Sequence, residues 1–446
     1  MKKFSFVASL LAIAFVISGC SNKAAVHSTV AAPFSDEQKA VLRLREDVDD
    51  YYPENVQAYE REDGNRAIYL YSAPIEQTSN LIVENEEGYV AEGSYFTKTF
   101  PFELSNVTPI EVSKGNNFAR IYLREGQIKG QLESRQNAFG LTKQAIVYED
   151  TFENGEDYIC YPTSFGVNTE IVIPKWTKEY KYQIKIQLPN LAPDTGSPDY
   201  ILFKTAFEKG TVKSLLYTPL VIDKNGNWSY ANSVKLVDKD SENNIYTVEY
   251  GVDEEFLNDK KTKFPVTLNQ SIHLYKPKQP DTSAYENTGD EASHYLSPYI
   301  LLGDDTLKGE GWTYIRYETL NNLHIDPDKI VSAKYIFHNL FDLEKETKIS
   351  AYAVTADWCS INTRWFNRPP FDEKPISEVI VKKSGDYQLD ITPLFTEMIR
   401  NKDVEGATYS VQNSFMIRSD TEDSNVIISS GDNGLYSPLL EIVLSE

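Results

Sequence analysis

Hydrophobic and polar residues alternate in short runs along most of this chain, and turn-forming residues separate the runs. Residues 181–187 show the pattern clearly, because Tyr182, Ile184 and Ile186 alternate with lysine and glutamine. Such alternation is typical of a strand with one buried face. Similar runs predict further strands at residues 66–70, 144–148, 170–174, 200–206 and 245–252. The pattern therefore predicts a mainly β protein built from antiparallel sheets.

A polar, proline-containing spacer at residues 276–290 divides these strands into two groups. The first group, residues 51–275, is expected to form one or two β domains. The second group, residues 291–446, contains one predicted helix, with Thr392 as its cap and Pro393 in its first turn. We therefore expect tandem antiparallel β-sandwich modules, of which the second is a jelly roll with one short helix.

Charge excludes two classes of partner. The chain has 446 residues and a formal net charge of −22, which becomes −24 (−22 − 2) if Lys2 and Lys3 are removed with a leader. So acidic a chain repels the phosphates of nucleic acids and of anionic lipid head groups. Neither a nucleic-acid-binding role nor a polybasic membrane contact is expected.

The amino terminus has the arrangement of an export signal. Two lysines precede an apolar run at residues 4–17, which is short for a membrane span. Small residues then precede Cys20, and this ending resembles the bacterial lipobox. The resemblance implies that residues 1–19 are a signal peptide, that the Cys20 sulfur carries a diacylglyceryl group, and that residues 20–50 form a tether. The alternative is an ordinary signal peptide followed by a chance cysteine.

The lipobox resemblance implies a lipoprotein whose fatty acyl chains, such as palmitate, hold it firmly in a bilayer. We therefore expect an exported protein on the extracellular or periplasmic side of the cell membrane. Two cysteines remain, Cys160 and Cys359, and they have no Cys-x-x-Cys or zinc spacing. They either pair or stay as buried free thiols, and the free thiols are the favoured interpretation.

An aromatic stretch at residues 357–371 is the most unusual feature of the second group. It contains Trp358, Trp365, Phe366 and Phe371 within one expected turn region. Rings at this density either fill a core or stack on sugar rings. Packing is the favoured interpretation for the two tryptophans. The orientation of their rings decides between a turn that stabilises the fold and a surface on which sugar rings stack.

Candidate glycan-binding residues follow from this stretch and from one earlier tryptophan. They are Trp312, Trp358, Trp365, Arg364 and Arg368. An arginine fork suits the carboxylates of uronic acids or the phosphates of wall polymers. The alternative for both arginines is a structural bond to loop carbonyls. The net charge opposes binding of anionic glycans beyond the screening range of salt.

Catalytic residues are not expected in this chain. The histidines are scattered, no G-x-S-x-G motif is present, and the many carboxylates suggest an acidic surface. The only cofactor candidate is a structural calcium ion, because calcium prefers the hard oxygens of acidic loops. Its candidate ligands are Asp304, Asp305, Asp432 and Asn433. Ordinary turn chemistry explains these residue types equally well and is favoured.

Several phrases of the second group occur in the order found in a known family. They are Leu302-Gly303, Arg316-Tyr317, 330–335, Trp358 with 364–369, Asp390-Ile391-Thr392, Ile417-Arg418-Ser419 and 437–442. This region resembles the DNRLRE domain, which is also classed with carbohydrate-binding modules. Arg364-Trp365 stands where the family has Thr-Trp, and Arg316-Tyr317 where it has Arg-Phe. The resemblance implies a jelly-roll binding module on an extracellular protein.

The first group resembles a different set of proteins. Its phrases are Asp63-Gly64-Asn65-Arg66, 71–75, 98–101, 221–226 and Phe264-Pro265-Val266-Thr267. Their order is similar to the amino-terminal region of Gram-positive wall-associated and Rhs-type surface proteins, although Asn269 replaces an aspartate of that family. The tyrosine-aspartate repeats and toxin cap of those relatives do not occur, so toxin delivery is not implied.

The residues and resemblances together favour a non-enzymatic, lipid-anchored surface protein. The favoured function is binding of a cell-envelope or extracellular polysaccharide through the second group of strands. One alternative is a structural or assembly role at the cell surface without affinity for glycans. The least favoured is a polysaccharide-acting enzyme.

Overall fold

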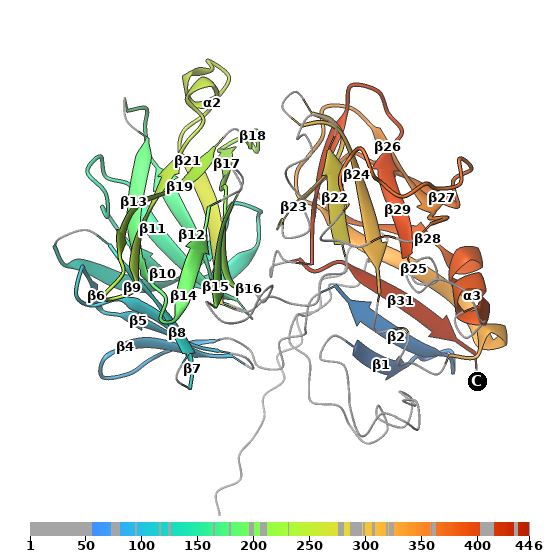
Figure 1. Cartoon of the computed structure of the whole chain (residues 1–446), viewed down its shortest axis with the longest axis horizontal. Coiled ribbons are helices and arrows are strands. Elements are labelled where there is room, and N and C mark those ends of the chain that lie inside the picture. The colour runs from blue at the N-terminus through green and yellow to red at the C-terminus, as the bar shows by residue number, and fades with distance from the viewer. Residues whose placement is uncertain are drawn as a thin grey trace, which may run out of the picture.

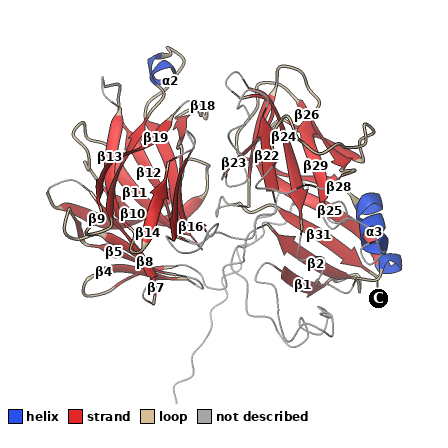
Figure 2. Ribbon diagram, in the orientation of Figure 1, coloured by secondary structure: helices blue, strands red, loops and turns tan. Residues whose placement is uncertain are grey.

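The protein consists of two β-sandwich modules (Figures 1 and 2). The computed structural model describes residues 56–445, except for 73–80, 94–95, 116, 124–125, 164–165, 178–179, 196–199, 206–211, 231, 275–280, 286–296, 298, 306–307, 318–319, 321–324, 357, 359–362, 402–413 and 432–435. The predicted leader, Cys20 and the tether lie outside these residues. Most described residues belong to antiparallel strands, so the predicted mainly β fold is confirmed. Among them no helix is long and apolar enough to cross a membrane.

The amino-terminal module packs two antiparallel sheets face to face. One sheet contains β6 (Glu103–Leu104), β9 (Ile128–Gln136), β10 (Thr142–Tyr148), β11 (Asp157–Thr163), β12 (Gly166–Ile173), β14 (Leu191–Asp194), β15 (Tyr200–Thr205), β16 (Val212–Tyr217), β17 (Leu220–Asp223), β18 (Trp228–Ser229) and β21 (Val266–His273). The other contains β3 (Ile82–Glu84), β4 (Gly88–Glu92), β5 (Thr97–Pro101), β7 (Ile110–Lys114), β8 (Asn117–Tyr122), β13 (Lys181–Gln187), β19 (Ser233–Asp240) and β20 (Ile245–Gly251). A short helix, α2 (Glu254–Asn258), precedes β21.

Alternation along the strands builds the core of this module. In β13 the side chains of Tyr182, Ile184 and Ile186 are buried, and the intervening lysines and glutamine face solvent. The buried residues belong to one cluster with residues of the opposite sheet, including Ile171 and Leu268. Burial of apolar surface on this scale is the main force that holds two sheets together.

The carboxy-terminal module is a single hydrogen-bonded set of strands folded into two layers. Its strands are β1 (Val56–Glu60), β2 (Arg66–Tyr71), β22 (Asp281–Tyr285), β23 (Tyr299–Asp305), β24 (Gly309–Arg316), β25 (Ile330–Asn339), β26 (Thr347–Ala353), β27 (Ser377–Val381), β28 (Gly385–Asp390), β29 (Ser414–Ser419), β30 (Asn425–Ser429) and β31 (Leu439–Leu444). Ile68 and Tyr335 of one layer share a core cluster with Ile315 and Ile417 of the other. A 3-10 turn, Pro327–Lys329, precedes β25.

The predicted helix of this module is present as α3 (Thr392–Asn401). Thr392 is its first residue, and the carboxylate of Asp390 accepts a hydrogen bond from the Thr392 backbone N–H. Phe395, Met398 and Ile399 are buried on one face, which packs over the β1–β2–β31–β25 layer at the edge of the module (Figure 1). Spacing of three and four residues places these side chains together.

Two segments lie in a different module or element from the one predicted. The hairpin of β1 and β2 falls within residues 51–275, yet β2 pairs along its whole length with β31 (Figure 1). Strand β22 falls within the predicted spacer 276–290 and pairs with β24. Val56 and Leu70 are fully buried in the carboxy-terminal core. Alternation in the sequence shows that one face of a strand is buried but does not show which sheet covers it.

The two modules meet through a buried aromatic contact, here called the seam. The ring of Phe139 lies 5.9 Å from that of Tyr299 and 6.0 Å from that of Phe341. Trp228 stacks on Phe341 with 6.2 Å between ring centroids. The Tyr299 hydroxyl also donates a hydrogen bond to the Asn269 side chain at 2.8 Å. Apolar packing and a buried hydrogen bond therefore join the modules.

A buried carboxylate lies under the amino-terminal side of the seam. Glu170 on β12 accepts hydrogen bonds from the Ala138 N–H at 2.7 Å, the Tyr161 hydroxyl at 3.2 Å and the Asn269 amide at 3.3 Å. Burial raises the pKa of Glu170 from 4.5 to about 7, although these hydrogen bonds lower it. Because Ala138 precedes Phe139, the carboxylate helps to position the turn that carries the seam aromatic.

Candidate functional site

The aromatic stretch packs against the outer surface of the carboxy-terminal module. Trp358 is buried, and its indole N–H donates a hydrogen bond to the Ser414 hydroxyl at 3.1 Å. Its ring lies 5.8 Å from that of Tyr314, and Tyr314 is fully buried. Trp312 is buried in the same cluster, where its ring contacts those of Trp365 at 4.9 Å and Phe371 at 5.2 Å. The stretch therefore covers one half of this sheet face as a packing element.

The two candidate arginines are held by this packing element. The Arg368 guanidinium lies 4.0 Å from the Trp365 ring and 4.5 Å from the Trp312 ring, and it donates a hydrogen bond to the Trp365 carbonyl at 2.6 Å. Arg364 donates to the Thr363 carbonyl at 3.1 Å. Arginine stacked between indole rings contributes to stability through cation–π attraction. These contacts correspond to the alternative role for both arginines, a structural bond to loop carbonyls.

The other half of the same sheet face is an open hollow of about 740 Å³, here called the outer-face hollow. Residues of β23, β24, β26, β27 and β29, and of the loop between β29 and β30, surround it. The residues that line it are Gly303, Asp304, Glu310, Lys348, Tyr352, Pro375, Glu378, Arg418, Ser419, Asp420, Thr421, Glu422 and Asp423. It adjoins the aromatic stretch, because the Arg418 guanidinium lies 5.4 Å from the Trp312 ring and 5.3 Å from the Phe371 ring.

A hydrogen-bonded network fixes the polar groups of the hollow. Asp420 accepts hydrogen bonds from the Tyr352 hydroxyl at 2.7 Å, from the Arg418 Nε at 2.9 Å and from the Ser350 hydroxyl. Burial alone would raise the pKa of Asp420, but Ser350, Tyr352 and Arg418 lower it below its ordinary value. Asp420 therefore remains ionised over the physiological pH range, and the network is pre-organised.

Charged groups of both signs complete the hollow. The Lys348 ammonium lies 3.0 Å from a Glu378 carboxylate oxygen and 3.9 Å from an Asp420 oxygen. Glu310 accepts a hydrogen bond from the Trp312 indole at 2.8 Å, which links the hollow to the aromatic stretch. The hollow is lined by both donors and acceptors, an arrangement that can bind hydroxyl groups, because each hydroxyl both donates and accepts.

The acidic loops have the contacts of turns. Asp305 is buried, and its carboxylate accepts a hydrogen bond from the Lys308 N–H at 3.0 Å, whereas Asp304 is exposed at the hollow. In the part of the chain that the structure describes, no group of three or more His, Cys, Asp or Glu side chains is arranged to hold a metal ion. Asp432 and Asn433 lie outside the described residues, as does Cys359, while Cys160 is a buried free thiol.

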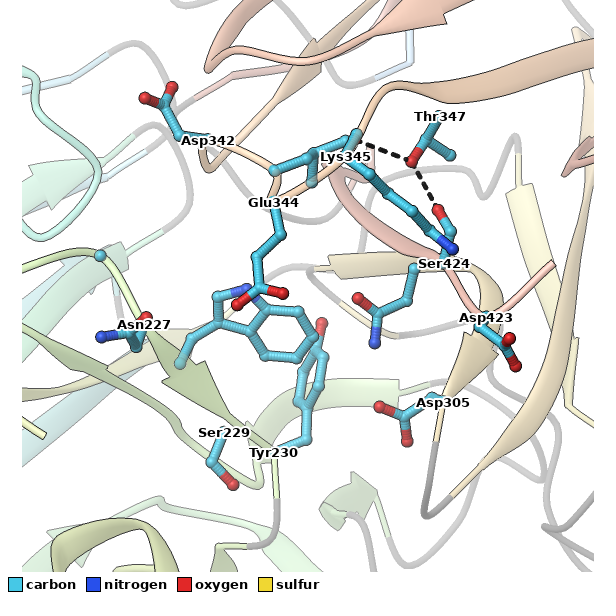
Figure 3. Close-up of a pocket in the computed structure, with 14 residues that line it drawn as sticks. Asn227, Ser229, Tyr230, Asp305, Asp342, Glu344, Lys345, Thr347, Asp423 and Ser424 are labelled. Atoms are coloured by element: carbon cyan, nitrogen blue, oxygen red, sulfur yellow. Dashed lines mark hydrogen bonds between the residues drawn. The ribbon is translucent and has the colours of Figure 1, made fainter. Parts of the chain in front are cut away.

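A second hollow, of about 690 Å³, lies at the seam and is here called the seam pocket (Figure 3). The hairpin of β17 and β18 supplies its amino-terminal wall, and the loops before β26 and before β30 supply the rest. The lining residues are Gly226, Asn227, Trp228, Ser229, Tyr230, Asp305, Asp342, Leu343, Glu344, Lys345, Thr347, Asp423, Ser424 and Asn425. Figure 3 shows Glu344 reaching toward the aromatic rings and Asp305 facing Tyr230 from the other module.

The hairpin that carries Trp228 is fixed by its own turn. Asp223 accepts hydrogen bonds from the backbone N–H groups of Asn225 at 2.8 Å and Asn227 at 2.9 Å. Gly226 adopts a positive φ of 84°, which glycine reaches without a steric penalty. Ile222 pairs with Trp228 across the hairpin. This pairing places the indole beside the seam, where it stacks on Phe341.

Most residues that define the two hollows were not among the sequence candidates; the exceptions are Asp304, which lines the outer-face hollow, and Asp305, which lines the seam pocket. Lys348, Tyr352 and Arg418 occupy alternate positions on neighbouring strands, so their shared outer face depends on the pairing of β26 with β29. Trp228 and Tyr230 follow the turn at residues 223–227 and are two positions apart. That spacing places two rings on one side of a strand, and it was the one available signal for an aromatic surface in the first group.

The fold and its two hollows define a class: a two-module antiparallel β-sandwich protein with open polar hollows on its carboxy-terminal module and at its seam. Comparisons with known proteins do not narrow this class, because no family model and no curated protein matches the chain. Among solved structures, the chain aligns with a crystal structure of exo-beta-1,3-galactanase from Phanerochaete chrysosporium with galactose. The aligned sequences are 9% identical, and the alignment covers 88% of this chain and 96% of that chain. The TM-score is 0.13, so this likeness carries no argument about ligand or activity.

Proposed function

We propose that this protein is an exported, lipid-anchored surface protein that binds a polysaccharide without breaking it down. The observation that carries the proposal is the outer-face hollow with its fixed network of Arg418, Asp420 and Tyr352. Sugar hydroxyls need donors and acceptors that are already oriented, because ordering them on binding would cost affinity. The hollow supplies both kinds of group next to an aromatic surface.

The charges of the hollow favour a neutral or mixed-charge glycan. Lys348 and Arg418 are each paired with carboxylates, and Glu310 and Asp304 add further negative charge. A polyanion would meet these carboxylates and the overall charge of −22. We therefore propose a polysaccharide of the cell envelope or of the surroundings in which hydroxyl groups dominate recognition.

The proposed anchor rests on Cys20 and the apolar run that precedes it. A diacylglyceryl group on the Cys20 sulfur would hold the sandwich modules at the membrane through buried methylene groups. Cys20→Ala should move the protein from the membrane fraction to the soluble fraction. Unchanged fractionation of this variant would contradict the anchor and would leave the glycan proposal untouched.

Retention on purified wall and capsular polysaccharides tests the proposed function. Arg418→Gln removes a guanidinium that is bonded to Asp420 at 2.9 Å, so we expect it to weaken retention about tenfold, the effect of losing a charge-assisted hydrogen bond. Affinity electrophoresis or depletion assays with each polysaccharide measure the effect.

The matched control is Arg120→Gln, which removes an arginine paired with Glu111 at 2.7 Å in the other module. It should leave retention unchanged. If wild-type protein is retained on no glycan, the binding proposal fails and a structural role at the cell surface takes its place. Release of reducing ends from a retained glycan would instead indicate an enzyme.

A further inference from the structure

The seam pocket is lined by two partly exposed aromatic rings, which the packing of the modules does not cover completely. Trp228 and Tyr230 lie edge to face, with 5.5 Å between ring centroids and 77° between their planes. One face of Trp228 stacks on Phe341 of the other module. Both rings keep part of their surface accessible within the hollow. An aromatic corner of this kind presents apolar faces to a ring-shaped ligand.

The protein already places one ammonium group against this aromatic corner. The Lys308 Nζ lies 5.3 Å from the centroid of the Tyr230 ring. Attraction between a cation and the negative face of an aromatic ring is strongest where both are partly desolvated. The corner therefore favours positive charge, and a ligand amine placed near Trp228 would gain from the same field.

Several carboxylates line the pocket around this corner. Glu344 and Asp423 are exposed, and among the described residues neither forms an ion pair. The Asp342 carboxylate is paired with Lys383 at 2.7 Å, which lowers its pKa. The Lys345 ammonium donates to the Glu422 carbonyl at 2.5 Å. Negative charge in the pocket thus remains available to a ligand.

We propose that the seam pocket binds an amine-bearing sugar, a hexosamine with a free amino group within a glycan chain. The sugar ring stacks on Trp228, and its ammonium group lies between the aromatic corner and the carboxylates of Glu344 and Asp423. Asn227 and Asn425 line the same pocket and supply amide groups for the hydroxyls. Because the walls come from both modules, the site exists only when the modules are docked.

This site shares only Asp423 with the outer-face hollow, and the proposal does not rest on binding at that hollow. Binding at the seam pocket discriminates by amine charge, whereas binding at the outer-face hollow depends on Arg418 and Tyr352. Substitution of Trp228 or Glu344 should leave the outer-face hollow intact, because neither residue lines it.

Calorimetric titration of the whole chain with a glucosamine tetramer and with its fully N-acetylated counterpart tests the proposal. We expect the tetramer with free amines to bind about tenfold more tightly, as the loss of a cation–π contact and its charge partners predicts. Trp228→Ala should remove most of the affinity. Glu344→Gln keeps the packing of an exposed position that lines the seam pocket and not the outer-face hollow. It should remove most of the preference for free amines and most of its salt dependence.

Trp176→Ala is the matched control, since Trp176 is 49% exposed in the same module and does not line the pocket. It should bind as the wild type does. Equal affinity for the two tetramers, absence of binding to either, or wild-type affinity in Glu344→Gln would each overturn the proposal. The Glu344 variant keeps the test decisive if Trp228→Ala disturbs the seam through the lost stacking on Phe341.

Discussion

Glu170→Gln is expected to stabilise the amino-terminal module at neutral and mildly alkaline pH. Glu170 is 2% exposed, and burial raises its pKa from 4.5 to about 7. Such a shift corresponds to about 3 kcal/mol between the protonated and ionised forms in the folded state. Glutamine keeps the acceptor oxygen for the Ala138 N–H and carries no charge, so we expect a gain of about 1–3 kcal/mol at pH 8.

The direction of the pH dependence follows from the raised pKa. A carboxyl group that holds its proton more tightly in the folded state contributes stability that is fully present below pH 4.5. This contribution is lost as the pH rises through about 7. The free energy of unfolding of the wild type should therefore fall across this window relative to Glu170→Gln. Urea unfolding at a series of pH values, followed by fluorescence, measures the difference.

Glu133→Gln is the control for this substitution. Glu133 lies on β9 of the same sheet, 38% of its side chain is exposed, and it is paired with Arg135 at 3.7 Å. It should change the free energy of unfolding by less than about 0.5 kcal/mol at any pH. If Glu170→Gln destabilises the protein at pH 8, or leaves the pH profile unchanged, Glu170 titrates near its ordinary pKa and the account of this network is wrong.

Leu70→Ala is expected to destabilise the carboxy-terminal module, although more than 200 positions along the chain separate the residue from β22 and the later strands of that module. Leu70 is fully buried on β2 and pairs with Leu440 of β31. Removing a buried leucine side chain costs about 2–5 kcal/mol through lost burial and the cavity that remains. A shift of the cooperative unfolding transition of the carboxy-terminal module to a lower denaturant concentration would show the effect.

Leu81→Ala makes the same chemical change at a residue that is 59% exposed. It should alter stability by less than about 0.5 kcal/mol. Comparable destabilisation by both variants, or none by Leu70→Ala, would mean that the β1–β2 hairpin does not belong to the carboxy-terminal core. The pairing of β2 with β31 would then be wrong.

Local patterns predicted individual elements well. The alternation in β13 showed which side chains are buried, because a strand places successive residues on opposite faces. The residue types at Thr392 and Pro393 located α3, because helix starts depend on nearby backbone groups. Both features are decided within about ten residues of the chain.

The same local patterns do not predict which strands pair when they are far apart in the sequence. The hairpin of β1 and β2 has the alternation of any half-buried strand pair, and only contact with β31 assigns it to a module. Packing is the favoured interpretation for Trp358 and Trp365; Trp358 is buried, whereas Trp365 is only partly buried. Tyr352 and Arg418 meet only because Tyr352 pairs with Met416 across two neighbouring strands, and no spacing in the sequence encodes that contact.

Hydrogen–deuterium exchange of the wild-type chain with and without a retained polysaccharide tests the central claim most directly. We expect slower exchange in peptides that cover residues 348–352 and 416–423, which line the outer-face hollow. Peptides from β3, β4, β5, β7 and β8, which belong to one sheet of the amino-terminal module, should exchange at the same rate in both states. Retention of a polysaccharide with unchanged exchange at residues 348–352 and 416–423 would contradict the assignment of the hollow as the binding site.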